Sequence, residues 1–281
     1  MLVVTADDLG YSAGIDRAIL AAYRDGIVRS TSLLVTFPRA QEAAEMARAA
    51  HGLEVGLHID LVEGTPVSDV ARVPTLVDAD GRFLGLGRLF RGLASGRVRA
   101  SEVAAEIRAQ VARARELGTP ALAWDSHRHV HLFPLVARVV GAVAKEQGAR
   151  WIRRASPPSP TRARKAVILG LATAGSSMFL RRVPGNDWYV DLTSRRPAPD
   201  AAWVALLATL PGVGEIGAHP GPGDDAHDPI AALRPRDLAL LTDPLLRVAL
   251  GDDTVRWRVP ARVVPGPRKG ASPPFHPPRT I

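Results

Sequence analysis

The sequence contains no cysteine, and this absence excludes several kinds of chemistry at once. Disulfide bonds, thiolate nucleophiles and zinc sites built on cysteine all need a side chain that this protein does not have. Any bound metal ion must therefore use histidine, aspartate or glutamate. The chain has 28 acidic residues and eight histidines from which such a site can be built.

Long apolar segments are also missing. The longest apolar run, AVILGLATAGSSMFL, spans residues 166–180, whereas a helix needs about 20 apolar residues to cross a bilayer. The run predicts a buried helix or, because its flanks are basic, a helix at a membrane interface, and we favour the buried helix. Asp7 and Asp8 interrupt the first apolar stretch, so we expect no secretory signal and a cytoplasmic protein.

Lysine is scarce. Three of the 36 basic residues are lysines, so the net charge of +8 comes almost entirely from arginine. A basic chain can bind nucleic acid or an anionic membrane surface. The arginines are scattered, however, apart from a cluster at 150–165 and a second near the C-terminus, and no RNA-binding motif accompanies them. We interpret the charge as a solvated surface and expect no nucleic-acid partner.

Short apolar runs rich in β-branched residues alternate with amphipathic stretches, a pattern typical of strand–helix units and a mainly parallel α/β sheet. Ser12 is expected to cap the first helix and Gly26 to end it, and a second helix is expected at 40–50. We place one domain at 1–264 and expect the proline-rich, basic tail 265–281 to be disordered. The clearest expected strands lie at 1–9, 29–37, 53–61, 121–131 and 213–221.

Polar residues gather where these expected strands end. In a parallel α/β barrel the carboxyl ends of the strands build the active site, so the clusters are expected to converge. Each motif alone has a plainer explanation, since Asp-Asp-Leu-Gly suits a turn and a single histidine suits a core or a strand end. The joint pattern favours a site made from Asp7, Asp8, His58, Asp60, Asp125, His127 and His219.

The segment DSHRHVHLFP at 125–134 places four polar residues at every second position: Asp125, His127, His129 and His131. Alternate side chains on a strand share a face, so Asp125 and His127 can both point into the site. We expect the last two histidines to run into the following loop. Three histidines and an aspartate of one parity have little structural rationale, which favours ligation or catalysis.

Four motifs in this order, TADDLG, GLHIDL, DSHRHVHLFP and GAHPG, resemble the YdjC-like carbohydrate deacetylases. That family includes chitooligosaccharide deacetylase and the hopanoid-biosynthesis-associated HpnK-type proteins. The resemblance covers 1–155 and 213–222 well and 157–205 loosely; Leu9 and Arg128 depart from common family residues without removing a functional group. It implies an irregular TIM-like (β/α) barrel, a homodimer, and a divalent metal ion bound by Asp8, His58 and His127.

The hypothesis that follows is metal-assisted hydrolysis of an N-acetyl group on an amino sugar. Asp7 takes a proton from water, His219 protonates the departing amine, and Asp125 orients a ligating histidine. Zn²⁺ suits these ligands by softness, whereas the family is associated with Mg²⁺, so both ions stay open. The candidates for sugar contacts or for orienting other groups are His129, His131, Trp124, Arg153, Asn186, Asp187 and Trp188.

The substrate is expected to be an oligosaccharide or, because of the run 166–180, a lipid-linked sugar reached by peripheral membrane contact. A metal-dependent phosphoesterase or amidohydrolase on a similar barrel is the enzyme alternative, and such enzymes usually hold two metal ions. The alternative from another class is a non-catalytic, arginine-rich module that binds anionic surfaces. That module leaves the ordered aspartate and histidine motifs unexplained.

Overall fold

A parallel sheet forms the centre of the protein. The computed structural model describes residues 1–156, 164–194, 199–250, 255–256 and 258–259. The strand order is β5-β4-β3-β2-β1-β7-β6, with β8 also pairing with β1, and every ladder is parallel. The strands are β1 (Leu2–Leu9), β2 (Ser30–Leu33), β3 (Glu54–Ile59), β4 (Ala123–Ser126), β5 (Trp151–Ile152), β6 (Trp188–Asp191), β7 (Gly214–Ala218) and β8 (Val255–Arg256).

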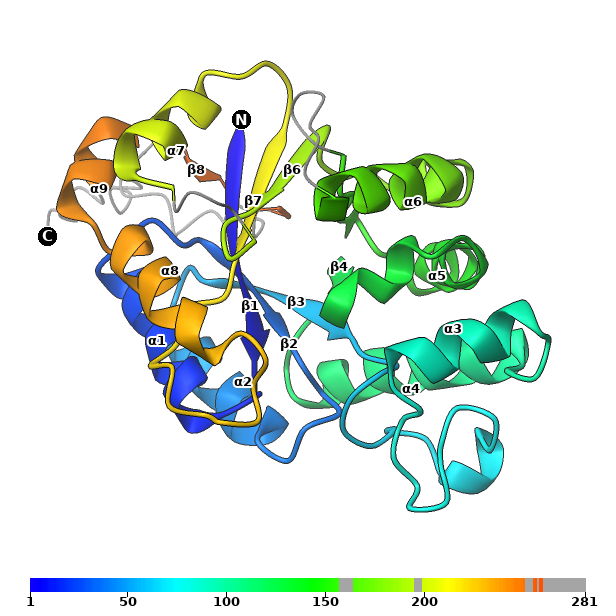
Figure 1. Cartoon of the computed structure of the whole chain (residues 1–281). Coiled ribbons are helices and arrows are strands. Elements are labelled where there is room, and N and C mark those ends of the chain that lie inside the picture. The colour runs from blue at the N-terminus through cyan, green and yellow to red at the C-terminus, as the bar shows by residue number, and fades with distance from the viewer. Residues whose placement is uncertain (157–163, 195–198, 251–254, 257, 260–281) are drawn as a thin grey trace, which may run out of the picture.

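The sheet curls, as Figure 1 shows, so that its two edges approach each other. Two backbone hydrogen bonds join the segments at these edges. The amide of Ile152 donates to the carbonyl of Pro184 at 2.9 Å, and that of Tyr189 donates to the carbonyl of Ser156 at 2.6 Å. The expected irregular TIM-like α/β fold is confirmed. That residues 1–264 form one domain stays a prediction, and the tail at 265–281 lies outside the described residues.

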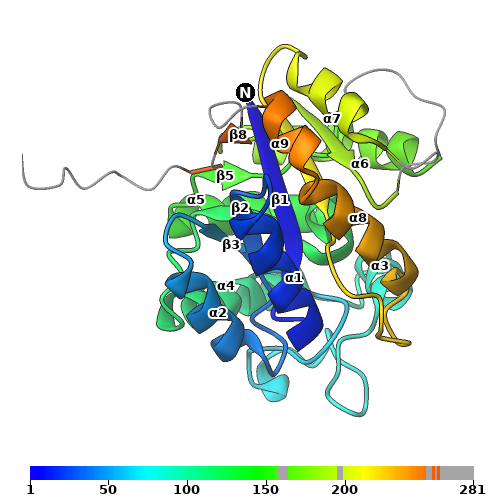
Figure 2. The same cartoon turned by 90° about the vertical axis from the view of Figure 1, so that its left-hand side faces the viewer.

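Helices surround the sheet, and Figure 2 shows α8 and α9 roughly in line with each other and α1 beside α8. Short 3₁₀ turns lie in the loops at Val70–Arg72, His127–Leu132 and Ala231–Leu233. The α-helices are α1 (Ala13–Arg24), α2 (Ala40–Ala49), α3 (Leu86–Ala94), α4 (Ala100–Glu116), α5 (Pro134–Gln147), α6 (Arg164–Leu180), α7 (Ala201–Ala208), α8 (Arg234–Leu241) and α9 (Pro244–Leu250).

Local sequence explains where these elements begin and end. Every residue of β1 is buried, as expected of a central parallel strand covered on both faces. The hydroxyl of Ser12 accepts a hydrogen bond from the amide of Ile15 and caps α1, as predicted. Gly148 ends α5 in the left-handed conformation, which glycine adopts without strain. Gly26 follows α1, where a Cβ would lie 2.1 Å from the carbonyl oxygen of Leu241.

Two expectations about elements are wrong. The strand expected at 121–131 ends at Ser126, and the chain then enters a 3₁₀ turn in which Arg128 and His129 have positive φ. The apolar run 166–180 does form a helix, α6. Over residues 171–180, however, this helix is only partly buried. Leu171 is 69% exposed and Met178 is 63% exposed. Among the described residues, no helix is long and apolar enough to span a membrane.

Candidate active site

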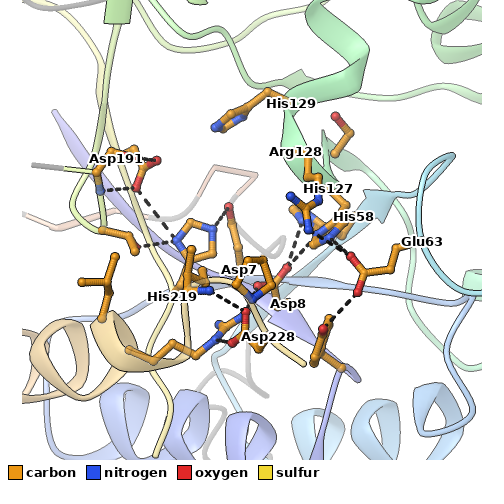
Figure 3. A pocket seen from close by; sticks show the side chains of 18 of the residues that line it. Asp7, Asp8, His58, Glu63, His127, Arg128, His129, Asp191, His219 and Asp228 are labelled. Atoms are coloured by element: carbon orange, nitrogen blue, oxygen red, sulfur yellow. Dashed lines mark hydrogen bonds and ion pairs between the residues drawn. The ribbon is translucent and has the colours of Figure 1, made fainter. Parts of the chain in front are cut away.

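A cavity of about 560 Å³ opens at the carboxyl ends of the central strands, where the polar clusters were predicted to converge. Its wall combines acidic, basic and histidine side chains with a few apolar ones (Figure 3). The lining residues are Asp7, Asp8, Tyr11, His58, Glu63, Leu86, Ser126, His127, Arg128, His129, Asp191, Thr193, Ser194, His219, Asp228, Pro229, Ile230, Leu233 and Arg234.

Asp8, His58 and His127 meet on one side of this cavity (Figure 3). Asp8 has φ of +71°, and this turn at the end of β1 lets two consecutive aspartates line the same cavity. Its Oδ1 lies 3.4 Å from Nε2 of His58 and 3.1 Å from Nδ1 of His127. One ligand atom from each residue lies within 4.8 Å of the others, and one carboxylate with two imidazoles suits a divalent cation. The residues present therefore fit a metal ion.

The pKa values of the two histidines reflect the carboxylates around them. Burial alone lowers the pKa of His58, but Asp125 and then Asp8 raise it to about 9. Burial likewise opposes the charge on His127, whereas hydrogen bonds with Asp8 and Glu63 raise its pKa to about 10. Without a cation, protons occupy the positions that face Asp8. Binding of a metal ion must therefore release protons.

Asp125 orients His58. Its Oδ1 lies 2.7 Å from Nδ1 of His58, which leaves Nε2 of that ring to face Asp8. Burial raises the pKa of the Asp125 carboxyl, but the Arg153 guanidinium, followed by His58 and Arg258, holds the pKa far below its usual range. A carboxylate that accepts the second N–H of a ligating imidazole fixes the tautomer and raises the basicity of the ligand. The position matches the orienting role predicted from the sequence.

Asp7 lies beside Asp8 but has different partners. Nη1 and Nη2 of Arg153 donate to its two carboxylate oxygens at 2.6 and 2.8 Å, and the Ser32 hydroxyl donates to Oδ1 at 3.2 Å. Across the cavity, Nε2 of His219 lies 3.9 Å from Oδ2 of Asp7. The structure thus brings together the two residues that the sequence analysis selected for proton transfer.

A short hydrogen-bond chain fixes the orientation of His219. The Thr193 hydroxyl donates to Oδ2 of Asp237 at 2.6 Å, so it accepts a hydrogen bond from Nδ1 of His219 at 2.7 Å. The same Asp237 oxygen accepts the amide N–H of His219 at 3.1 Å. With Nδ1 used in this way, Nε2 of the ring is the nitrogen that faces Asp7 and the cavity.

Glu63 is a site residue that the sequence analysis missed. Its Oε2 lies 3.0 Å from Nε2 of His127, and its Oε1 accepts from the Tyr11 hydroxyl at 3.0 Å. The hydrogen bond with His127 lowers the pKa of Glu63 to about 2. Asp60 holds the turn that delivers Glu63, because its Oδ1 accepts the backbone N–H of Val62 and of Glu63. The available signal was the position of Glu63 just after the third strand.

Arg234 at the start of α8 was also missed. Its Nη2 donates to Oδ2 of Asp8 at 2.7 Å, and its Nε pairs with Asp228. Burial raises the pKa of the Asp8 carboxyl, but the charge on Arg234 and the hydrogen bonds with the two histidines bring it well below its usual range. One oxygen of Asp8 is therefore held by Arg234, while the other faces His58 and His127.

The last two histidines of the DSHRHVH segment have different surroundings. His129 lines the cavity and lies edge-on to the Tyr189 ring, with 5.4 Å between the ring centroids. His131 is fully buried away from the cavity. Its Nε2 donates to the carbonyl oxygen of Arg153 at 2.8 Å, and its Nδ1 pairs with Ser126. His131 therefore supports the backbone of Arg153 and cannot contact a sugar in this cavity.

Five other residues expected near a sugar do not line the cavity. Trp124 is a core residue whose indole N–H donates to the carbonyl of Ala121. Arg153 is buried with all its charge directed at carboxylates. Asn186, Asp187 and Trp188 lie at the start of β6, at the opposite end of the parallel strands from the site. They hold the backbone there, through contacts with Arg154, Val213 and Pro211, respectively.

A second group of possible ligands consists of Asp7, His58 and Asp125. It shares His58 with the first group, and Arg153 donates to both of its carboxylates at 2.6 to 2.8 Å. A guanidinium already supplies the positive charge that a second cation would bring. Among the described residues, the arrangement therefore favours one metal ion at Asp8, His58 and His127.

Comparison with known proteins agrees with this geometry. A family model described as YdjC-like protein matches residues 1–252. The chain belongs to the YdjC-like family. This YdjC-like chain is 33% identical over 290 residues to the carbohydrate deacetylase of Mus musculus, an alignment that covers 91% of this chain and 92% of that relative.

Two further relatives extend the comparison. The chitooligosaccharide deacetylase of Serratia marcescens is 38% identical over 150 residues, which covers 53% of this YdjC-like chain and 57% of the relative. A crystal structure of an Enterococcus faecalis V583 protein proposed to cleave cellobiose phosphate superposes with a TM-score of 0.74 and 25% identity, covering 90% of this chain and 95% of that one. The fold is thus shared over nearly the whole chain.

Proposed function

We propose that this protein is a metal-dependent hydrolase that removes the N-acetyl group from an N-acetylated amino sugar. The observation that carries the proposal is the placement of Asp8, His58 and His127 beside the facing pair Asp7 and His219 in one cavity. The naming of relatives as carbohydrate and chitooligosaccharide deacetylases supports the same chemistry. The reaction converts an acetamide and water into acetate and a free amine.

When bound at Asp8, His58 and His127, a divalent cation supplies a Lewis acid that polarises the acetamide carbonyl and acidifies water. Asp7 accepts the proton of the attacking water, while Arg153 and Ser32 hold its carboxylate in place. His219, whose Nε2 faces Asp7, is the residue that delivers a proton to the departing amine. Glu63 and Tyr11 close the side of the cavity next to His127.

The donor set supports either Zn²⁺ or Mg²⁺. Two imidazoles favour Zn²⁺ by softness, whereas oxygen ligands favour Mg²⁺, and the carboxylates of Asp8 and Glu63 both lie next to His127. A measurement of acetate release by metal-depleted protein after addition of each ion separates the two.

The central experiment measures acetate release from N-acetylglucosamine oligosaccharides and N-acetylglucosaminyl lipids. We expect release by the metal-loaded wild type and its loss in His127→Ala. His51→Ala is the matched control, because His51 is an exposed histidine outside the cavity. No release from any substrate, with metal demonstrably bound, would contradict the proposal.

The sugar is proposed to be either soluble or lipid-linked, as in hopanoid biosynthesis. Leu171 and Met178 are exposed on α6, and the adjoining Arg181 and Arg182 are exposed as well. An apolar helix surface beside arginines suits an anionic bilayer. Retention on anionic liposomes is expected to be lost in the double variant Leu171→Glu, Met178→Glu and kept in Leu245→Glu, which changes an exposed leucine on α9.

The phosphoesterase or amidohydrolase alternative predicts two metal ions per chain. The pairing of Asp7 and Asp125 with Arg153 favours one ion, as the deacetylase proposal requires. The number of metal ions per chain, measured by plasma emission spectroscopy, therefore distinguishes the deacetylase from the phosphoesterase or amidohydrolase. We also propose that the protein is a homodimer, which light scattering coupled to gel filtration tests.

A further inference from the structure

Arg258 is a buried arginine in the short segment after β8, near the C-terminal end of the described residues. Its side chain reaches β2 and β4. Strand β8 pairs in parallel with the start of β1 through Leu2 with Val255 and Val3 with Arg256. The side chain of Arg258 is 0% exposed. It lies beyond the family match, which ends at residue 252, and it does not line the cavity.

Its guanidinium contacts three different elements. Nη1 donates to Oδ2 of Asp125 at 2.7 Å, and Nη2 donates to the carbonyl oxygen of Thr31 at 2.7 Å. Nε lies 3.3 Å from Oε1 of Glu54, whose other oxygen accepts the amide N–H of Val259 at 3.2 Å. One side chain thus connects the segment 258–259 to β2, β3 and β4.

Strand β3 has a glycine, Gly56, where the Arg258 side chain packs against it. Gly56 lies two residues before His58, so both positions face the same side of the sheet. A Cβ at residue 56 would lie 2.4 Å from Nη2 of Arg258 and 2.6 Å from the carbonyl oxygen of Ala123. The glycine leaves the space in which the guanidinium lies, directly behind the histidine that faces Asp8.

The charges around Asp125 explain why a second arginine is needed there. Oδ1 of Asp125 faces His58, while Oδ2 contacts Arg153 at 2.8 Å and Arg258 at 2.7 Å. Arg153 also pairs with Asp7 and Glu215, so it is shared among three buried carboxylates. Burying a charge is unfavourable unless it is paired and hydrogen-bonded. Arg258 supplies Asp125 with a partner that is not shared with Asp7.

We propose that Arg258 is a positioning residue of the metal site, which fixes Asp125 so that Asp125 holds His58 with Nε2 toward Asp8. The inference rests on the metal site of the proposed function. The order of contacts is Arg258 to Asp125, Asp125 to His58, and His58 to Asp8. Partners that orient a ligating histidine in this way change metal affinity by about 10- to 100-fold.

The test is a titration of the full-length, metal-depleted protein with Zn²⁺ against a competing chelating dye. We expect Arg258→Met to bind Zn²⁺ at least about tenfold more weakly than the wild type. Arg258→Lys is expected to be intermediate, because it keeps the positive charge but has a single donor nitrogen in place of the guanidinium's three. Arg247→Met is the matched control, since Arg247 is an exposed arginine on α9, and its affinity is expected to be unchanged.

A double-mutant comparison separates positioning from a merely structural role. If Arg258 acts through Asp125, Arg258→Met weakens Zn²⁺ binding far less in an Asp125→Asn background than in the wild type. All titrations are made well below the unfolding temperature of each variant. Should Arg258→Met not fold, Arg258→Lys and its combination with Asp125→Asn provide the same comparison.

Three results would overturn the inference in distinguishable ways. A wild type that binds Zn²⁺ while the folded Arg258 variants bind it equally tightly contradicts the positioning role and leaves the proposed function standing. A wild type that binds no cation contradicts the proposed metal site, and the role of Arg258 with it. Additive effects of Arg258→Met and Asp125→Asn would also contradict action through Asp125.

Discussion

The two halves of the chain contribute to the site in different ways. Strands β1, β3 and β4 supply the proposed metal donors from short motifs at their carboxyl ends. The segments from β5 to β8 and α8 supply Arg153, His219, Arg234 and Arg258, which come from far along the chain. Their side chains reach Asp7, Asp8 or, for Arg258, the Asp125 that contacts His58. The first half thus carries the donors, and the second half mainly orients them and balances their charge.

Loss of a donor is expected to have the largest effect. Asp8→Ala removes the oxygen that faces both histidines, and we predict that acetate release falls by about a thousandfold or more, because a bound ion contributes several kcal/mol of charge stabilisation. Steady-state assays with equal metal content measure the change. Asp80→Ala, at an exposed aspartate, is expected to leave the rate unchanged.

Loss of the Arg153 guanidinium, which pairs with buried carboxylates, is expected to reduce the stability of the fold. Arg153→Met leaves Asp7, Asp125 and Glu215 without a shared partner, and breaking a buried ion pair costs about 3–5 kcal/mol. Urea unfolding measures this loss. Arg108→Met, at an exposed pair with Glu146, is expected to cost less than about 1 kcal/mol. Equal costs for the two variants would contradict the distinction between the halves.

Acidification is expected to weaken the support of Arg153 through His131. Burial lowers the pKa of His131 to about 4, below the value near 6.5 of an unfolded histidine. Between pH 6.5 and 4 the unfolded chain therefore takes up a proton that the folded chain does not, so stability falls with falling pH. The loss approaches about 3 kcal/mol below pH 4.

Comparison with His131→Gln isolates this contribution, because glutamine keeps a donor for the Arg153 carbonyl and does not titrate. Urea unfolding of both proteins at pH 7 and pH 5 is the measurement. The wild type is expected to lose more stability than the variant over that interval. Parallel losses would show that His131 is not held neutral in the fold.

The smallest expected effect concerns the hydrogen bond that orients His219. Thr193→Val removes the hydroxyl between Nδ1 of His219 and Asp237, and we predict a fall in kcat of about ten- to a hundredfold with little change in KM. Thr193→Ser is expected to restore the rate. A pH–rate profile unchanged by Thr193→Val would argue against a role for His219 as the acid.

The sequence predicted the parallel fold and the gathering of Asp7, Asp8, His58, Asp125 and His219 because these residues end strands of one sheet. Such residues carry a local signal, namely a polar side chain directly after an apolar run. The same local reasoning gave the cap at Ser12. It also extended the fourth strand too far, since apolar-polar alternation cannot reveal the 3₁₀ turn that begins at His127.

The orienting residues carry no comparable signal. Arg258 and Asp125 are separated by 133 positions, and nothing in the neighbourhood of either residue indicates the other. Asn186, Asp187 and Trp188 are of residue types that suit sugars, but they lie at the start of β6, a strand that is not among the clearest expected ones. Without that strand, the sequence did not indicate which end of the sheet these residues occupy. Long-range pairing likewise requires the folded structure.

The proposed function requires a cation at Asp8, His58 and His127 for removal of the acetyl group. Acetate release from an N-acetylglucosamine oligosaccharide is measured before chelation, after metal depletion confirmed by elemental analysis, and after stepwise return of Zn²⁺ or Mg²⁺. We expect release to disappear on depletion and to return fully at one equivalent per chain in the wild type, but not in His58→Ala. Undiminished release by the depleted wild type would contradict the metal requirement.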